Sequence, residues 1–308
     1  MRLEPVSALA RSLGCACREK IPLSGCTSFK IGGPAALVID APEPAALQQL
    51  LGACREEEVP VLFLGNGSNV LAADSGFPGA VLRLSGGAPV IAGREDGGVL
   101  VDCPAGVPLK ALCRFAREAG LSGLEFAYGI PGAAGGAVYM NAGAYGGQMS
   151  DVLVSVEAVS SDGAAVREVP ASAMALGYRH SVLMETGEIV LSVRVRLHPD
   201  DKAEIGARME EFMRRRREKQ PLEYPSAGSF FKRPAGYFAG ALIEQSGLKG
   251  FAVGGAQVSE KHAGFVINRG GATCADVRAL AAEVIRRVEA DHGVRLEPEV
   301  RFLPGNDG

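Results

Sequence analysis

The spacing of apolar residues along the chain predicts a mixture of helices and strands. From Pro44 to Glu58 apolar side chains recur every three or four residues, which predicts a helix with one buried face. Two-residue alternation over Val190–Leu197 predicts a half-buried strand. The same patterns predict further helices at about Ser7–Cys15, Leu109–Ala119, Lys202–Lys219, Tyr237–Gln245 and Thr273–His292, and further strands at Ala36–Asp40, Val61–Leu64, Val99–Cys103, Val152–Val159, Phe265–Asn268 and Glu299–Leu303. The predicted fold class is α+β.

Length and charge narrow the functional classes. A chain of 308 residues predicts two or three domains, and 47% hydrophobic with 22% charged residues is ordinary globular composition. The formal net charge of −3 gives no reason to expect a nucleic-acid partner. The N-terminal residues do not resemble a secretory signal, and no apolar stretch predicts a membrane span. We therefore expect a soluble, cytoplasmic protein that does not bind membranes.

Cysteine and histidine usage argues against a metal site. None of the seven cysteines forms a Cys-x-x-Cys pair, and the four histidines lack metal-ligand spacing. We expect no bound metal and no disulfide framework, which suits a reducing compartment.

Glycine clusters in two loops, residues 65–69 and 129–147. Glycine tolerates positive φ and lets backbone amides approach a ligand, so such loops can form an anion-binding nest. The alternative is a pair of tight turns without a ligand. The residues predicted to bind a cofactor are Gly65, Asn66, Gly67, Ser68, Asn69, Gly129, Pro131, Gly132, Gly135, Gly136, Asn141 and Gly143.

The first loop does not match the dinucleotide-binding fingerprint. Gly65-x-Gly67-x-x-Val70 lacks the third glycine, and the residues after it include Asp, Gly and Pro where a long helix should begin. We therefore predict a cofactor site of another kind.

A series of short blocks runs in order through nearly the whole chain. They are SFKIGGPA (28–35), LGNGSNVL (64–71), GIPGAAGGAVYMNAGAYG (129–146), GYRHSVL (177–183), KQP (219–221), PSAGSFFKRP (225–234), FAGALIEQSGLKG (238–250), GGAQVSEKHAGFVIN (254–268) and LEPEVRF (296–302). Together these blocks resemble the UDP-N-acetylenolpyruvoylglucosamine reductase family. A single glycine loop is weak support, but ordered blocks over the whole chain are strong support.

The resemblance implies a fold and a reaction. The fold is the vanillyl-alcohol-oxidase type, with FAD-binding subdomains at 1–81 and 82–204 and a substrate-binding domain at 205–308 whose last strand returns toward the flavin. The implied reaction is the reduction of UDP-N-acetylglucosamine enolpyruvate to UDP-N-acetylmuramate, for peptidoglycan precursors. It uses non-covalent FAD, with NADPH as co-substrate. We expect a monomer, with an oligomer left open.

Three residues fall on the family's catalytic positions. Hydride addition from FAD N5 to C3 of the enolpyruvyl group pushes electrons into the neighbouring carboxylate, so the site needs a cation or an acid there. By resemblance, Arg179 and Glu299 stabilise this enediolate, and Ser229 gives the proton to C2. A protonated Glu299 implies a raised pKa.

Substrate contacts follow from the same blocks. The resemblance implies Tyr178, Lys219, Lys232, Arg233 and Gln257 as substrate-binding residues, with the lysines beside the pyrophosphate. Position 233 is Arg where many relatives carry Asn. The stretch from Arg179 to Lys202 is too short for the tyrosine-bearing substrate loop of one subtype, so the chain resembles the type II form.

Two other functions remain open from the sequence. One is an oxidase with the same flavin fold, which the blocks after residue 219 disfavour. The other is a flavin- or nucleotide-binding module without turnover, which the intact catalytic positions disfavour.

Overall fold

The chain divides into two compact units. The computed structural model describes residues 1–304, so the last four residues of the predicted third domain lie outside it. Unit 1 consists of Met1–Glu19, Leu37–Asn66 and Gly79–Arg214. Unit 2 consists of Lys20–Ala36, Gly67–Pro78 and Arg215–Gly308. The chain passes from unit 1 to unit 2 within the first glycine loop, after Asn66.

A six-stranded sheet is the centre of unit 1. Its order is β12-β11-β13-β7-β6, with β8 paired to β13. These neighbouring strands are antiparallel. The buried residues of β13 alternate, as predicted, because one face packs on helices. The strands are β6 (Val90–Glu95), β7 (Gly98–Pro104), β8 (Leu121–Ser122), β11 (Leu153–Val159), β12 (Val166–Pro170) and β13 (Ile189–Pro199).

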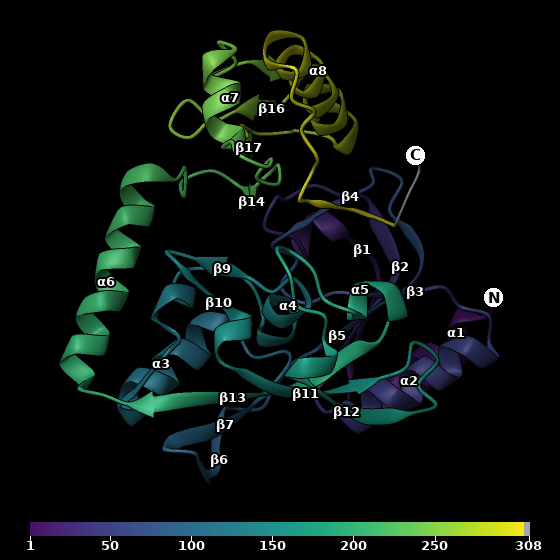
Figure 1. Ribbon diagram of the computed structural model, residues 1–308. Coiled ribbons are helices and arrows are strands. Elements are labelled where there is room, and N and C mark those ends of the chain that lie inside the picture. Colours follow the sequence, from purple (N-terminus) through teal and green to yellow (C-terminus); the bar gives the residue numbers. More distant parts are fainter. Residues whose placement is uncertain (305–308) are drawn as a thin grey trace. The chain divides into compact units, whose positions relative to one another are not determined.

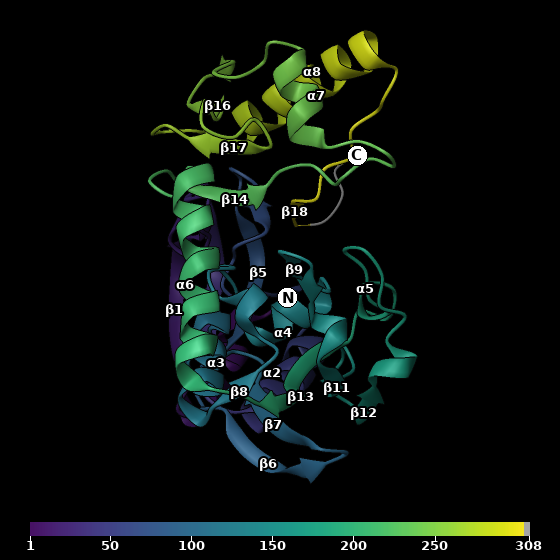
Figure 2. The ribbon, with the colours of Figure 1, turned by 60° about the vertical axis from the view of Figure 1, so that its left-hand side comes forward.

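Helices cover one face of this sheet (Figures 1 and 2). Helix α3 (Leu109–Ala119) packs on α4 (Ala134–Tyr139), and α4 packs on β7 and β13. Helix α3 ends where the sequence predicted, at Gly120 with φ 69°. Helix α6 (Lys202–Lys219) has the predicted bounds, and its residues up to Arg214 belong to unit 1.

A second sheet, mostly of unit 1, has the order β1-β2-β5-β3. Helix α2 (Pro44–Glu56) buries the face predicted from its apolar spacing, including Leu47 and Leu50. Helix α1 (Leu3–Ser12) packs against α2. The strands are β1 (Ala16–Pro22), β2 (Pro34–Ala41), β3 (Val61–Phe63) and β5 (Phe77–Leu84).

Unit 2 has a four-stranded sheet with the order β14-β17-β16-β15. Helix α7 (Ala239–Gln245) packs on α8 (Cys274–His292), and α8 packs on β15 and β16 (Figure 2). The strands are β14 (Ser226–Ser229), β15 (Ala252–Val253), β16 (Ala256–Val258) and β17 (Phe265–Asn268). Near the end of the chain, β18 (Arg301–Leu303) pairs in parallel with β4 (Val70–Ala72), directly after the first glycine loop.

Several predictions about elements differ from the structure. The predicted helix Tyr237–Gln245 begins at Ala239, and the predicted strand Glu299–Leu303 begins at Arg301. The first helix begins at Leu3 rather than near Ser7, because the Ser7 hydroxyl donates to the Glu4 carbonyl inside the helix instead of capping it. Strand β1 was missed because its exposed, mostly polar residues show no alternation. The segment 129–147 was predicted as a loop. It contains α4, the short strand β9 (Gly143–Ala144) and the start of the short strand β10 (Gly147–Gln148).

Helix α4 is glycine-rich and forms through tertiary contacts. The amides of Ala134 and Gly135 donate to the carbonyls of Val107 and Ala105, at 2.9 Å each. These long-range bonds outweigh the poor helix propensity of glycine. Among the described residues, no helix has both the length and the apolar character needed to cross a membrane.

Candidate active site

The first glycine loop is shaped by close backbone packing. Gly67 has φ 60°, and a Cβ on it would lie 2.2 Å from the carbonyl oxygen of Cys26. The amide of Ser28 donates to the Gly67 carbonyl at 3.0 Å, and the Ser28 hydroxyl donates to the Ser226 carbonyl at 2.6 Å. Strand β4 follows at once, so the long helix of a dinucleotide fold is absent here, as predicted. Only glycine fits at position 67.

The glycines of the second loop serve different purposes. A Cβ on Gly135 would lie 2.7 Å from Cβ of Ala105, so this glycine is needed for packing. The adjacent Gly136 is exposed, and nothing lies within 4 Å of the position that its Cβ would take. A Cβ on Gly65 would meet Cβ of Ala133 at 3.7 Å, so the two glycine loops approach one another here.

These loops fit a bound flavin in part. The backbone is bare at Gly136, and Gly129 and Gly132 adopt φ values of 101° and 148°, which suit a ligand that approaches the main chain. The amide of Gly135, however, is already used by the Ala105 carbonyl. Gly135 is therefore in the loop for packing, and the open backbone beside it is at Gly136.

The remaining predicted cofactor residues lie in or beside these loops. Gly143 is packed tightly, since its Cβ would lie 2.7 Å from the Gly147 carbonyl oxygen. Asn66 and Pro131 are exposed, and Ser68 and Asn69 are half-buried.

Asn141 links the second loop to the turn that carries Arg179. Its side chain is buried, and its φ is 41°. The side-chain amide donates to the Gly177 carbonyl at 3.0 Å, and the side-chain oxygen accepts from the amide of Ser150 at 2.9 Å. The sequence predicts Asn141 as a cofactor residue, and in the fold its side chain supports the neighbouring turn.

Arg179 occupies a strained backbone position. Gly177 and His180 exchange main-chain hydrogen bonds of 3.2 and 3.3 Å, and Arg179 between them has φ 54°. Its guanidinium donates to the Gly143 carbonyl at 3.4 Å and lies 5.1 Å from the ring centroid of Tyr178, which is 53% exposed. A non-glycine residue in this region costs on the order of 1 kcal/mol or more, and such strain is found preferentially at functional sites.

A buried serine, missed from the sequence, holds this turn from its other end. Ser181 is fully buried, and its hydroxyl donates to the Tyr139 carbonyl, at the end of α4, at 2.7 Å. A serine directly after a strained arginine carried no recognisable signal by itself. The turn is thus attached to the second glycine loop through both Asn141 and Ser181.

Ser229 and Glu299 are brought together within unit 2. Ser229 is exposed at the end of β14, and the amide of Glu299 donates to the carbonyl of the next residue, Phe230, at 2.8 Å. Asn69 adds a second link, because its side-chain amide donates to the Glu299 carbonyl at 3.2 Å and its own carbonyl accepts from Arg301 at 3.0 Å. Two of the three predicted catalytic residues and part of the first glycine loop therefore share one hydrogen-bonded neighbourhood.

The predicted substrate residues differ in whether their side chains already contact other residues of the protein. The ammonium of Lys232 pairs with the Glu297 carboxylate at 3.2 Å. The guanidinium of Arg233 lies 5.0 Å from the ring centroid of Phe238, which is 65% exposed. Lys219, at the end of α6, is exposed.

Gln257 is engaged on both sides of its amide. Its nitrogen donates to the Gly250 carbonyl at 2.9 Å, and its oxygen accepts from Arg269 at 2.9 Å. The side chain is buried, so this amide contributes to the fold of unit 2.

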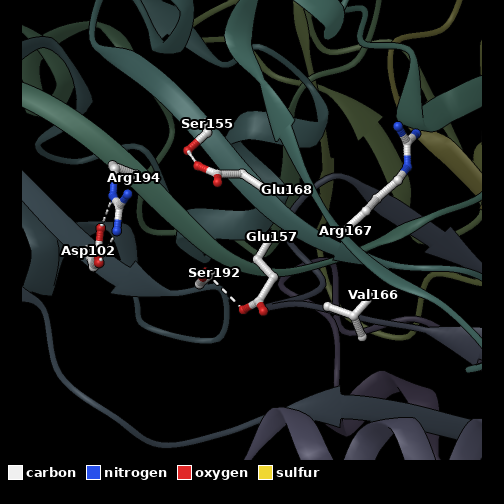
Figure 3. Close-up of a pocket in the computed structure, with 8 residues that line it drawn as sticks. All are labelled: Asp102, Ser155, Glu157, Val166, Arg167, Glu168, Ser192 and Arg194. Carbon is white, nitrogen blue, oxygen red and sulfur yellow. Dashed lines mark hydrogen bonds and ion pairs between the residues drawn. The ribbon is translucent and has the colours of Figure 1, made fainter.

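A hollow of about 340 Å³ on the six-stranded sheet contains none of the predicted residues (Figure 3). It is polar, and most of its charged side chains form hydrogen bonds with one another, while Arg167 pairs with Glu188 outside the hollow. Arg194 forms two hydrogen bonds with Asp102, at 2.6 and 2.8 Å, and Ser155 donates to Glu168 at 2.6 Å. The hydrogen bond from Arg194 holds the pKa of Asp102 below its ordinary value. This hollow is a solvated, internally paired sheet face.

Comparisons with known proteins cover nearly the whole chain. Residues 35–168 match an FAD binding domain, and residues 220–303 match the C-terminal domain of UDP-N-acetylenolpyruvoylglucosamine reductase. The reductase of that name from Agathobacter rectalis is 47% identical over 291 residues, which is 92% of each chain. The one from Syntrophomonas wolfei is 47% identical over 282 residues, 92% of this chain and 93% of the relative.

A solved structure agrees with these relatives. The UDP-N-acetylenolpyruvylglucosamine reductase of Thermus caldophilus has a TM-score of 0.77 and 40% identity, over 94% of this chain and 100% of that one. The predicted fold, an FAD-binding part of the vanillyl-alcohol-oxidase type followed by an α+β C-terminal domain, is confirmed.

Proposed function

The chain belongs to the UDP-N-acetylenolpyruvoylglucosamine reductase family and is an FAD-dependent oxidoreductase, and we propose that it reduces UDP-N-acetylglucosamine enolpyruvate to UDP-N-acetylmuramate. The observation that carries this proposal is the 47% identity over 92% of the chain, which spans both the FAD-binding part and the C-terminal part. The electron donor is NADPH, the product enters peptidoglycan precursor synthesis, and the enzyme works in the cytoplasm.

The two glycine loops hold FAD without a covalent link. FAD, when bound, supplies a hydride from N5 to C3 of the enolpyruvyl group and is reduced again by NADPH. The bare backbone at Gly136 and the positive φ angles of Gly129 and Gly132 support main-chain contact with the cofactor.

Arg179 and Glu299 stabilise the charge that hydride addition creates. As C3 gains the hydride, electron density moves onto the substrate carboxylate, and a guanidinium offers two parallel donors to such a planar group. Protonated Glu299 donates one further hydrogen bond to the same enediolate. The strained backbone of Arg179 supports this role, because the surrounding hydrogen bonds hold it in one conformation.

Ser229 completes the reaction by giving a proton to C2. Its exposed position at the end of β14 leaves the hydroxyl accessible, and the Glu299–Phe230 backbone bond keeps the proposed acid next to it in the fold.

Substrate binding rests on Lys219, Lys232, Arg233, Gln257 and Tyr178. The Lys232 ammonium already faces a carboxylate, Glu297, so a pyrophosphate must compete with that partner. We further propose the type II form without a tyrosine substrate loop, a monomer, and the three-domain division at residues 81 and 204.

The test follows the flavin absorbance band of the protein under anaerobic conditions. NADPH is added first, and UDP-N-acetylglucosamine enolpyruvate second. Bleaching by NADPH and recovery on adding the enolpyruvyl substrate is the expected result. Bleaching without recovery would refute the substrate and favour an oxidase of the same fold. A protein that binds FAD but is not bleached by NADPH would refute the donor.

Residue roles are tested by Ser229→Ala, with Ser226→Ala on the same strand as the matched control. Removal of one oriented donor costs about 3 kcal/mol of transition-state stabilisation, so recovery of the flavin band should slow by roughly a hundredfold or more. Bleaching by NADPH should not change. Equal recovery rates in the two variants would remove Ser229 from the mechanism.

A further inference from the structure

Both ring nitrogens of His180 face hydrogen-bond acceptors. Nδ1 lies 2.9 Å from the main-chain carbonyl oxygen of Ala175, and Nε2 lies 3.0 Å from a carboxylate oxygen of Glu185. Glu185 belongs to α5 (Leu183–Thr186), which directly follows the turn that carries Arg179. The imidazole therefore connects Ala175, which precedes the Arg179 turn, to α5, which follows it.

Both contacts can be hydrogen bonds at the same time in only one protonation state of the ring when Glu185 is ionised. A carbonyl oxygen can only accept, so Nδ1 must carry a hydrogen. An ionised carboxylate also only accepts, so Nε2 must carry one as well, which makes the ring an imidazolium. A neutral ring keeps one of the two bonds and loses the other unless Glu185 itself is protonated.

The segment that this ring spans has a strained backbone. Ala175 has φ 46° and Arg179 has φ 54°, both in the left-handed region that residues other than glycine rarely adopt. Such conformations persist only where surrounding contacts hold them. The His180 bond to the Ala175 carbonyl closes the segment on itself, next to the Val182–Met174 backbone bond of 2.7 Å.

We propose that His180, as an imidazolium, is a positioning residue that holds the loop 175–180 closed and thereby orients Arg179. The inference rests on the proposed function, because it requires Arg179 to act on the substrate carboxylate. It adds a protonation-dependent step to that function: turnover falls when His180 loses its proton, because Arg179 is then held less well.

The charge around the ring agrees with this role. The hydrogen bond to the Ala175 carbonyl, and then the one to the Glu185 carboxylate, raise the pKa of His180 above its ordinary value of 6.5. Among the described residues, Glu185 is the charged group that affects the pKa of His180. Arg179 precedes His180 in the chain, and its guanidinium lies beside the Gly143 carbonyl and the Tyr178 ring. Because the pKa is raised, the contribution of the imidazolium to the closed loop is present below pH 6.5 and is lost as pH rises through the higher, folded-state value.

The experiment measures the rate of flavin reoxidation by the enolpyruvyl substrate from pH 6 to 9 in wild type, His180→Gln and Glu185→Gln. Wild type should slow by about two- to fivefold as His180 deprotonates, a modest change because the ion pair is solvent-exposed. His180→Gln should lack this change and show the slower rate throughout. Glu185→Gln should move the change to lower pH, since the imidazolium loses its carboxylate partner.

His198→Gln is the matched control, because it makes the same replacement at an exposed histidine of unit 1, at the end of β13. It should keep the wild-type profile. A wild-type profile in His180→Gln would overturn the proposal, since the pH dependence would then belong to another group.

Nuclear magnetic resonance titration of the His180 ring separates the two possible failures. The expected result is a titration above pH 6.5 in wild type that moves down in Glu185→Gln. An active enzyme whose His180 titrates at or below 6.5 overturns the positioning role and leaves the proposed function standing. A raised, Glu185-dependent titration in a protein that never reoxidises with the enolpyruvyl substrate refutes the proposed function, and the positioning role with it.

Discussion

The side-chain amide of Asn69 donates a hydrogen bond of 3.2 Å to the main-chain carbonyl of Glu299, 230 residues further along the chain. Asn69 ends the first glycine loop, and Glu299 is the proposed acid. The bond therefore connects the first glycine loop to the backbone of Glu299, and the parallel pairing of β4 with β18 continues that connection.

Asn69→Ala should lower turnover by about five- to tenfold, because one half-buried hydrogen bond is worth roughly 1 kcal/mol. Stopped-flow flavin reoxidation gives the rate, and FAD titration gives the affinity. Gln49→Ala, which removes a side-chain amide from the exposed side of α2, serves as the control. An unchanged reoxidation rate in Asn69→Ala would show that Glu299 is placed by its backbone contacts alone.

Two adjacent glycines of α4 should respond oppositely to alanine. Gly136→Ala meets no atom within 4 Å and gains helix propensity of about 0.5–1 kcal/mol, so the fold should be retained while FAD binds more weakly. Gly135→Ala places a methyl 2.7 Å from Cβ of Ala105 and should destabilise the fold. Thermal unfolding without cofactor and FAD titration measure the two effects. Unweakened FAD binding in Gly136→Ala would argue that the cofactor does not pass over this backbone.

Ser181→Ala should slow turnover without unfolding the protein. The change removes the 2.7 Å bond to the Tyr139 carbonyl that holds the Arg179 turn, at a cost of about 1 kcal/mol in stability. Steady-state kinetics should show the loss mainly in kcat, because the orientation of Arg179 matters most when charge develops. Ser192→Ala, in the hollow of Figure 3, makes the same replacement away from this turn and should have no effect. Equal kcat values for the two variants would contradict the positioning of Arg179 by Ser181.

Asp74→Ala should lower the free energy of unfolding by about 1–2 kcal/mol. The Asp74 carboxylate accepts from the amides of Cys274 and Ala275, at 2.8 and 3.1 Å, and so caps the first turn of α8 from a distant segment. Asp291→Ala, near the other end of the same helix, removes an acidic side chain where the helix dipole disfavours it and should be neutral or slightly stabilising. Urea unfolding of both variants compares them, and similar losses would show that Asp74 acts by some means other than capping.

The pattern of the sequence determined the elements whose signals are local. Helix α3, with its apolar stripe and Gly120, helix α6 and strand β17 have the predicted bounds, and α8 begins one residue later because Thr273 is its cap. The ordered blocks likewise sufficed to identify the family, since they lie along one chain in one order. Each of these features depends on residues close together in sequence.

Tertiary structure decided what depends on residues far apart. Gly135 is needed for close packing because Ala105, about 30 residues away in the chain, lies against it. The spacing of glycines in the sequence does not show which of them have such a neighbour. The same holds for Asn141, whose amide goes to Gly177, and for Ser181, whose hydroxyl goes to Tyr139. Strand β1 has no alternating pattern in its sequence, and it forms a strand because it pairs with β2 at the edge of the second sheet. The candidate residues could be read from the sequence, but the contacts that orient them are made only when the chain folds.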